Sequence, residues 1–280
     1  TPIHSTISRQ RTPTVYPYGY TAIEGRSTMS TIGSNPKPGS ASSSIPTAPT
    51  APSHATPTPA TSGLPEWDRV LAVMAHPDNE SFGLGAVISS FTAANVTVDV
   101  LCLTRGEAST LHGVEGDLAT IRERELRAAA DALGIRHVDL RALPDGGLAD
   151  LSPTVLDDEV ERAVATTRPD GILTFDTTGI SGHTDHIAAT DAAVRAGDRH
   201  DLPVLAWTLP DAICGRLDDD GYAGFLGRPM SEIDLILTVD RTAQLSAVDC
   251  HPSQAVPGSV LWRRLDLQGD TELLRWLRQP

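Results

Sequence analysis

The chain has 280 residues and a formal net charge of −14, and 40% of its residues are hydrophobic. That length suffices for one sizeable domain with a buried core or for two small ones. The first 62 residues carry +3, so the remainder carries −17, the difference between −14 and +3. A globular part this acidic repels phosphate, which excludes nucleic acid and anionic membranes from the expected partners.

Cysteine usage and apolar segments bear on the cellular compartment. The three cysteines, Cys102, Cys214 and Cys250, are widely spaced and contain no CxxC pair, so they indicate a reducing compartment and no disulfide framework. The sequence has no run of about 18 apolar residues, as a transmembrane helix requires. The N-terminal residues lack the apolar core of a signal peptide, and the expected location is therefore the cytoplasm.

The N-terminal segment differs in composition from the rest of the chain. Residues 1–62 consist mainly of Ser, Thr, Pro, Ala and Gly. Such a stretch cannot bury enough apolar surface to offset the entropy that ordering costs, so we predict that it is disordered. It contains no amphipathic pattern of a docking helix. We expect a leader over residues 1–64 and one domain over residues 65–280.

Strands and helices alternate along the predicted domain. The apolar run RVLAVMAH, which ends in polar residues, is typical of a buried parallel strand. A strongly amphipathic segment later in the chain ends at Gly134, a residue suited to terminate a helix. In chain order, we expect strand 69–76, helix 81–95, strand 96–104, helix 117–134, strand 137–143, helix 155–167, strand 171–176, helix 185–197, and strands 203–210 and 234–240.

This alternation predicts an α/β, Rossmann-like fold, with a mostly parallel sheet and helices on both faces. In such sheets the functional site lies where strands end and helices begin. Three loops occupy that position in the predicted order, and they span residues 75–81, 104–116 and 176–186.

Two of these loops present histidine together with aspartate. The first loop contains AHPDNE at 75–80, and the third contains GHTDH at 182–186. Imidazole and carboxylate are the ligands of catalytic zinc, which takes three protein ligands and keeps one position for water. Taken alone, either loop has a plainer explanation, because Asp78 or Asp185 is also a suitable helix N-cap. The two loops together favour a zinc site.

The paired motifs AHPDNE and GHTDH resemble those of the LmbE-like, or PIG-L, de-N-acetylase family. Weaker similarities are TRGEAS, RERELRAAADALG, LPDG and CHPSQA, and the resemblance extends over residues 68–280. Members of this family remove acetyl from N-acetylglucosamine in precursors of GPI anchors, in mycothiol biosynthesis and in antibiotic pathways. The resemblance therefore implies a zinc-dependent hydrolase that removes an N-acyl group from a small molecule containing an amino sugar.

The resemblance also implies roles for individual residues. His76 and His186 would bind zinc, and Asp78 would be the general base that activates water. His183 would stabilise the oxyanion or protonate the leaving amine, and Asp185 would orient a catalytic group by hydrogen bonding.

Three further residues match positions near the family's substrate pocket. Glu107, Arg122 and Asp145 would hold hydroxyl groups of the sugar. Arg122 also has a structural explanation, because it lies three residues before Glu125 on one predicted helix and the two side chains can form an ion pair.

The motif departs from the family at Asn79, where the third zinc ligand is normally aspartate. An amide oxygen brings no negative charge, so zinc affinity should fall. A working enzyme with weaker zinc, an inactive engineered variant and a relative that only binds its ligand remain alternatives, and Asn79 also suits a helix N-cap that faces away from any metal. A nucleotide-binding Rossmann protein is disfavoured, because the first strand-to-helix turn lacks GxGxxG.

Overall fold

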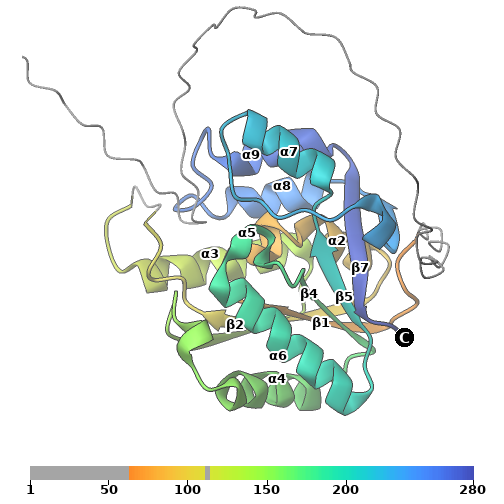
Figure 1. Ribbon diagram of the computed structural model, residues 1–280. Coiled ribbons are helices and arrows are strands. Elements are labelled where there is room, and N and C mark those ends of the chain that lie inside the picture. The colour runs from red at the N-terminus through yellow and green to blue at the C-terminus, as the bar shows by residue number, and fades with distance from the viewer. Residues whose placement is uncertain (1–62, 111–113) are drawn as a thin grey trace, which may run out of the picture.

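The computed structural model describes residues 63–110 and 114–280, which form a seven-stranded sheet flanked by helices (Figure 1). The predicted leader, residues 1–64, lies outside the described residues except for Gly63 and Leu64. The strands are β1 (Arg69–Met74), β2 (Thr97–Thr104), β3 (His137–Leu143), β4 (Gly171–Phe175), β5 (Val204–Thr208), β6 (Leu235–Thr238) and β7 (Thr271–Arg278).

The sheet has the order β3-β2-β1-β4-β5-β7-β6. All neighbouring pairs from β3 to β5 are parallel, and β7 pairs antiparallel with both β5 and β6. The α/β, mostly parallel fold predicted from the sequence is confirmed. From β1 the chain first builds the sheet outward through β2 and β3, and it then returns to add β4 on the other side of β1. Such a reversal places a binding site at the carboxyl ends of β1 and β4.

Strand β1 shows why the sheet needs helices on both faces. Val70, Ala72 and Met74 pack into one hydrophobic cluster, which includes side chains of α2, α3 and α8. Leu71 and Val73 point to the opposite face and pack against α4 and α6. Because successive side chains of a strand point to opposite faces, an apolar run without alternation is buried on both sides.

The helices cover the two faces as Figure 1 shows, with α4 and α6 together on one side. They are α1 (Asn79–Phe82), α2 (Gly85–Ala93), α3 (Leu118–Leu133), α4 (Pro153–Thr167), α5 (Gly179–Gly182), α6 (Thr184–His200), α7 (Asp211–Asp219), α8 (Thr242–Asp249) and α9 (Val260–Gln268). Gly134 ends α3 with φ of 72°, as expected.

The single helix predicted over 81–95 is instead two helices, α1 and α2. The chain breaks at Gly83, where a Cβ atom would lie 2.5 Å from the Phe175 ring. The close packing of this turn against β4 therefore requires glycine.

The sequence patterns did not predict β7 or the helices α7, α8 and α9. Strand β7 contains Glu272, which is fully buried and accepts hydrogen bonds from Trp207 and Gln268. A buried carboxylate interrupts the apolar pattern by which strands are recognised. Among the described residues, none of the helices has both the length and the apolar character needed to cross a bilayer.

Candidate metal centre

The loop after β1 turns sharply at Asp78, whose φ of 94° is uncommon for a residue other than glycine. The Glu80 carboxylate accepts a hydrogen bond from the Asp78 backbone N–H at 2.9 Å. Asn79 Oδ1 accepts a hydrogen bond from the His76 backbone N–H at 3.1 Å. Residues 76–80 are all buried, so these bonds hold the loop in one strained conformation, as is common at functional sites.

The loop after β4 brings two more histidines to the same edge of the sheet. His183 is the N-cap of α6, and its Nδ1 accepts a hydrogen bond from the Asp185 backbone N–H at 3.2 Å. His186 lies on the first turn of α6, with its Nδ1 3.1 Å from the Gly179 carbonyl oxygen. Ile180 has φ of 66°, a strained value for a β-branched residue, so this loop stores strain as well.

Two imidazole nitrogens face each other across these loops. His76 Nδ1 lies 3.2 Å from His186 Nε2. The other nitrogen of His76, Nε2, lies 3.1 Å from an Asp145 oxygen and 3.2 Å from an Asp185 oxygen, so Nε2 carries a hydrogen. The other nitrogen of His186 faces a carbonyl oxygen and carries a hydrogen too. If both rings are neutral, the two facing nitrogens present lone pairs to each other, and either a proton on His76 Nδ1 or a metal ion would relieve their repulsion.

The donor set fits zinc. Two nitrogen ligands about 2.0–2.1 Å from a tetrahedral zinc ion lie about 3.3 Å apart, close to the observed separation of the facing nitrogens. Although burial alone lowers the pKa of His76, hydrogen bonds to Asp145 and Asp185 outweigh it and raise the pKa. The same two carboxylates favour positive charge at this position, whether it is a proton or a metal ion.

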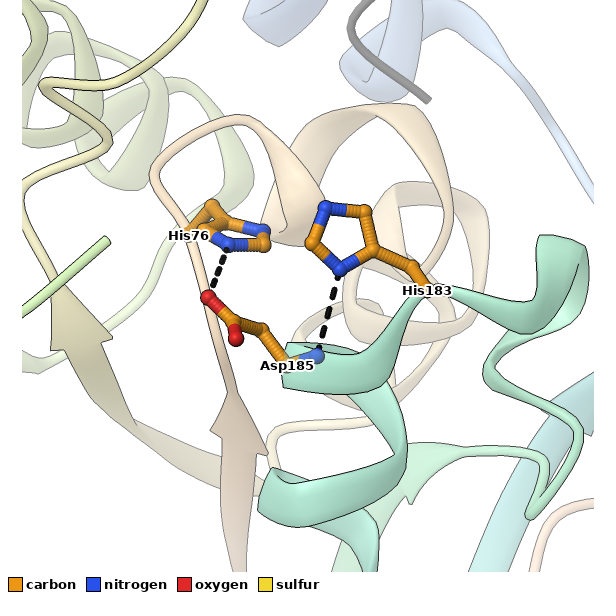
Figure 2. A group of neighbouring side chains, drawn as sticks. All are labelled: His76, His183 and Asp185. Atoms are coloured by element: carbon orange, nitrogen blue, oxygen red, sulfur yellow. Dashed lines mark hydrogen bonds and ion pairs between the residues drawn. The ribbon is translucent and has the colours of Figure 1, made fainter. Parts of the chain in front are cut away.

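His76, His183 and Asp185 form a group whose ligand atoms all lie within 4.8 Å of one another (Figure 2). Both oxygens of Asp185 are already engaged, however. Oδ1 accepts a hydrogen bond from the Leu148 backbone N–H at 3.0 Å, and Oδ2 accepts one from Gly146 at 2.7 Å besides that from His76. Asp185 therefore orients His76 through Oδ2, while Oδ1, which accepts a single hydrogen bond, keeps a lone pair that a metal ion could use.

Asn79 is a further candidate for the third ligand. The backbone N–H of His76 needs an acceptor, so Asn79 Oδ1, not Nδ2, faces that N–H. Asn79 Oδ1 keeps a second lone pair, which could bind a metal ion. Its Nδ2 donates a hydrogen bond to Asp78 Oδ1 at 3.0 Å. The side chain is buried and lines the same pocket as His186, and the N-cap position belongs to Asp78, so Asn79 does not face away from the site.

Asp78 is held by Arg122 from α3. The guanidinium Nη2 donates a hydrogen bond to Asp78 Oδ2 at 2.9 Å, and Nη1 donates to the Gly106 carbonyl oxygen at 2.6 Å. Burial raises the pKa of Asp78, although the Arg122 charge opposes this effect. Arg122 does not pair with Glu125, whose carboxylate accepts hydrogen bonds from the backbone and hydroxyl of Ser253. Arg122 is buried, and its contacts serve to fix the Asp78 carboxylate.

Asp145 and Glu107 lie on the side of His76 that carries Nε2. Asp145 contacts that nitrogen through Oδ1 and accepts a hydrogen bond from the Ala108 backbone N–H through Oδ2 at 2.7 Å. Burial opposes ionisation of Asp145, but the contact with His76 outweighs it and lowers the pKa. Glu107 is exposed, and its carboxylate accepts a hydrogen bond from the Asp145 backbone N–H at 3.3 Å.

His183 is neutral near pH 7. Burial and the nearby charge of His76 lower the pKa of His183 to about 4. Because Nδ1 accepts from the Asp185 N–H, the neutral ring carries its hydrogen on Nε2. His183 therefore presents a hydrogen-bond donor to the site.

Glu80 and His251 form a buried pair that sequence reasoning missed. His251 Nε2 lies 2.6 Å from Glu80 Oε1, and both side chains are fully buried. Glu80 also accepts the hydrogen bond from the Asp78 backbone N–H, so the contact with His251 helps to fix the loop after β1. The two residues are 171 positions apart, and the only signal in the sequence was the short motif CHPSQA.

An apolar pocket with a volume of about 60 Å³ opens beside His186 and Asn79. Aromatic and aliphatic side chains form most of its wall. It is lined by Asn79, Phe82, Gly83, Phe175, Ile180, Ser181, His186, Trp207, Phe225, Val260, Leu261 and Arg264.

Comparison with known proteins gives related sequences and a related fold. Residues 71–197 match the family model described as PIG-L, GlcNAc-PI de-N-acetylase. A probable N-acetyl-alpha-D-glucosaminyl L-malate deacetylase of Bacillus anthracis is 27% identical over 75% of this chain and 92% of that protein. A probable N-acetylglucosaminyl-phosphatidylinositol de-N-acetylase of Schizosaccharomyces pombe is 34% identical, over 46% of this chain but only 51% of that protein.

Among solved structures, a zinc-inhibited form of the teicoplanin deacetylase Orf2 has the same fold. It superposes with a TM-score of 0.57 over 75% of this chain and 98% of that one, at 21% identity. The sequence matches cover the two loops that carry His76, Asp78, Asn79, His183 and His186. Residues 71–197 are therefore similar to the PIG-L, or LmbE-like, family, and the named relatives are deacetylases, which hydrolyse an amide C–N bond other than a peptide bond.

Proposed function

We propose that this protein is a zinc-dependent hydrolase that removes an N-acyl group, acetyl in the first instance, from a small molecule containing an amino sugar. The observation that carries the proposal is the separation of 3.2 Å between His76 Nδ1 and His186 Nε2. The carboxylate of Asp78, the N-cap of α1, belongs to the same loop as His76. The names of the relatives from Bacillus anthracis and Schizosaccharomyces pombe support an N-acetylglucosamine derivative as substrate.

His76 Nδ1, His186 Nε2 and Asn79 Oδ1 would hold the zinc ion. Three protein ligands leave one position for water or substrate, which distinguishes a catalytic zinc site from a structural one. Zinc, when bound, acts as a Lewis acid and lowers the pKa of water. Asp185 and Asp145 hold the His76 ring through Nε2, so that its lone pair stays directed at His186.

Asp78 would be the general base. Its carboxylate sits in a fixed orientation between the Arg122 guanidinium and the Asn79 amide. Burial raises the pKa of Asp78, which makes the carboxylate a better proton acceptor than an exposed aspartate. In this role it accepts a proton from the attacking water and can return it to the leaving amine.

His183 would stabilise the oxyanion that develops on the acyl carbonyl. A neutral ring with hydrogen on Nε2 donates a hydrogen bond without first changing its protonation state. Asp185 fixes this tautomer, because its backbone N–H occupies Nδ1 of His183. Asp185 therefore orients His183 with its backbone and His76 with its side chain.

Glu107 and Asp145 would bind sugar hydroxyl groups beside His76. Glu107 is exposed, and its carboxylate lies at the open side of the site. Arg122, in contrast, is buried against Asp78, so any effect of Arg122 on the substrate would act through Asp78.

Asn79 supports a second candidate function, which is a ligand-binding relative that holds little metal. A neutral amide attracts a divalent cation less than a carboxylate does. In the described residues Asn79 also hydrogen bonds to Asp78, which keeps that carboxylate in place without a metal ion.

The two candidates are separated by metal analysis and an amine-release assay. The purified protein is stripped with a chelator and titrated with zinc to one equivalent, because a structural relative is described as zinc-inhibited. Release of amine from N-acetylglucosamine conjugates should be absent in the stripped protein and should rise in proportion to bound zinc. His186→Gln is the matched variant, which should retain less zinc. If the wild-type protein binds no zinc and releases no amine at one equivalent, the ligand-binding function is supported instead.

A further inference from the structure

The apolar pocket begins at the candidate metal ligands. Asn79 and His186 form part of its wall, and the other contributors are mainly Phe82, Phe175, Ile180, Trp207, Phe225, Val260 and Leu261. A group that enters this pocket from the metal site is therefore the group attached directly to the reacting carbonyl. The pocket accordingly bears on which acyl group the enzyme removes.

Two aromatic side chains of the pocket wall, Phe175 and Trp207, are held by specific contacts. The Phe175 ring packs edge to face on His186, at a centroid distance of 4.8 Å, and lies 5.4 Å from the Trp207 ring. The indole N–H of Trp207 donates a hydrogen bond to Glu272 at 2.6 Å, and the Arg264 guanidinium lies 5.1 Å from the centroid of the Trp207 ring. Buried side chains held this way keep a preformed cavity open.

Charged groups occupy the other side of the site. Asp145 and Glu107 lie on the Nε2 side of His76, whereas the pocket adjoins His186 and Asn79. An N-acylated amino sugar has a polar sugar, a central carbonyl and an apolar acyl chain. With the carbonyl at the metal site, the polar side receives the sugar and the apolar pocket receives the acyl chain.

We propose that the apolar pocket is an acyl-chain subsite that accepts linear acyl groups of about three to five carbons in preference to acetyl. One water molecule needs about 10–15 Å³ of such space. The 60 Å³ of the pocket therefore hold about four atoms of carbon chain, whereas acetyl places only a methyl group there. The inference rests on the proposed function, because it assumes that the carbonyl reacts between His76 and His186.

The energetic expectation follows from the burial of methylene groups. Each buried methylene group should raise kcat/KM about fourfold, the equivalent of about 0.8 kcal/mol. N-butyrylglucosamine has two more methylene groups than N-acetylglucosamine, so the expected advantage is on the order of tenfold or more. Chains longer than the pocket should gain nothing further.

The test compares N-acetyl-, N-propionyl-, N-butyryl- and N-octanoylglucosamine as substrates of the enzyme loaded with one equivalent of zinc. We expect kcat/KM to rise from acetyl to butyryl and to rise no further at octanoyl. If kcat/KM is highest for the acetyl substrate and falls progressively for propionyl and butyryl, the proposed subsite is wrong.

Val260 lines the pocket, so Val260→Phe should fill it. The matched control is Val155→Phe on α4, where the side chain is 37% exposed and does not line the pocket. The ratio of butyryl to acetyl turnover should fall at least about fivefold in Val260→Phe and should not change in Val155→Phe. An unchanged ratio in Val260→Phe would place the acyl chain elsewhere.

Calorimetry on the zinc-free protein gives a readout that does not depend on turnover. N-butyrylglucosamine should bind about tenfold more tightly than N-acetylglucosamine, and Val260→Phe should remove this difference. If binding shows this preference but no substrate is hydrolysed with zinc, the subsite stands and the proposed catalytic function fails. If acetyl and butyryl compounds bind equally, the subsite fails, whatever the enzyme hydrolyses.

Discussion

At the scale of single residues, Asn79 places a neutral amide beside the Asp78 carboxylate, where an aspartate would add a second negative charge. Its amide nitrogen donates a hydrogen bond to Asp78 Oδ1 at 3.0 Å, where an aspartate would place a second carboxylate oxygen. Two carboxylates at that distance repel each other unless a cation lies beside them. We therefore expect the neutral amide to keep the Asp78 carboxylate in place without metal and to lower the affinity of the proposed site for zinc.

Asn79→Asp should therefore bind zinc at least about tenfold more tightly, and the zinc-free variant should have a lower Tm than the wild-type protein. Titration against a competing chelator measures the affinity, and thermal unfolding with and without zinc measures the stability. Asn95→Asp adds the same charge at an exposed position and serves as control. Equal zinc affinities of Asn79→Asp and the wild type would remove Asn79 from the ligand set.

His183 should affect turnover and leave zinc binding intact. The ring is also the N-cap of α6, so His183→Ala removes a cap as well as the Nε2 donor. His183→Asn keeps a good capping residue while it removes the donor. We expect both variants to retain zinc and to lose turnover by a factor of about 10² or more. Loss of zinc from His183→Asn would instead favour the ligand group of His76, His183 and Asp185.

The same histidine should make stability depend on pH. Burial lowers its pKa from 6.5 to about 4, so the folded protein holds the ring neutral while the unfolded chain protonates it below pH 6.5. The stabilisation is complete above pH 6.5 and is lost as the pH falls towards 4. Between pH 7 and 5, the zinc-free wild type should lose about 2 kcal/mol more unfolding free energy than His183→Asn. Urea unfolding at the two pH values measures this, and an equal loss in both proteins would contradict the lowered pKa.

At the scale of elements, a short segment near the C-terminus supports the loop after β1. His251 contacts Glu80, and Ser253 bonds to Glu125 of α3, so residues 251–253 join two elements that frame Asp78. Although burial opposes it, the Glu80 charge raises the pKa of His251, as expected of a buried ion pair. The segment thereby holds the backbone of the proposed general base in its strained conformation.

Breaking this pair should cost stability. His251→Ala leaves the Glu80 carboxylate buried without its partner, and the unfolding free energy should fall by about 3 kcal/mol or more. The double variant Glu80→Gln with His251→Gln removes both charges and should recover part of the loss. Urea unfolding of the three proteins measures both effects. A loss below about 1 kcal/mol in His251→Ala would show that the pair does not stabilise the fold.

Local patterns in the sequence predicted the elements that follow local rules. The apolar runs predicted β1 to β6, and the amphipathic pattern with Gly134 predicted α3. Strand β7 was missed because its Glu272 is buried through contacts with distant residues. The two His-Asp motifs brought the site residues together because their strands are neighbours, whereas the contact between Glu80 and His251 depends on the complete fold.

At the scale of the whole molecule, Trp67 packs the segment before β1 against the core. This side chain stacks on Phe91 at a centroid distance of 5.8 Å and contacts Trp276 of β7 edge to face at 5.9 Å. It also covers Gly171, where a Cβ atom would lie 2.2 Å from the indole ring. Trp67 thus joins α2, β4 and β7.

A chain that begins at Gly63 should therefore keep the Tm and the turnover of the full-length protein. A chain that begins at Asp68 lacks Trp67 and is the matched control. Loss of this large buried side chain should cost about 3 kcal/mol or more, which corresponds to a Tm lower by about 6 °C or more for a domain of this size. Thermal unfolding and the amine-release assay on the three proteins measure these effects. A clear loss of Tm or turnover in the chain beginning at Gly63 would show that residues 1–62 contribute to the folded enzyme.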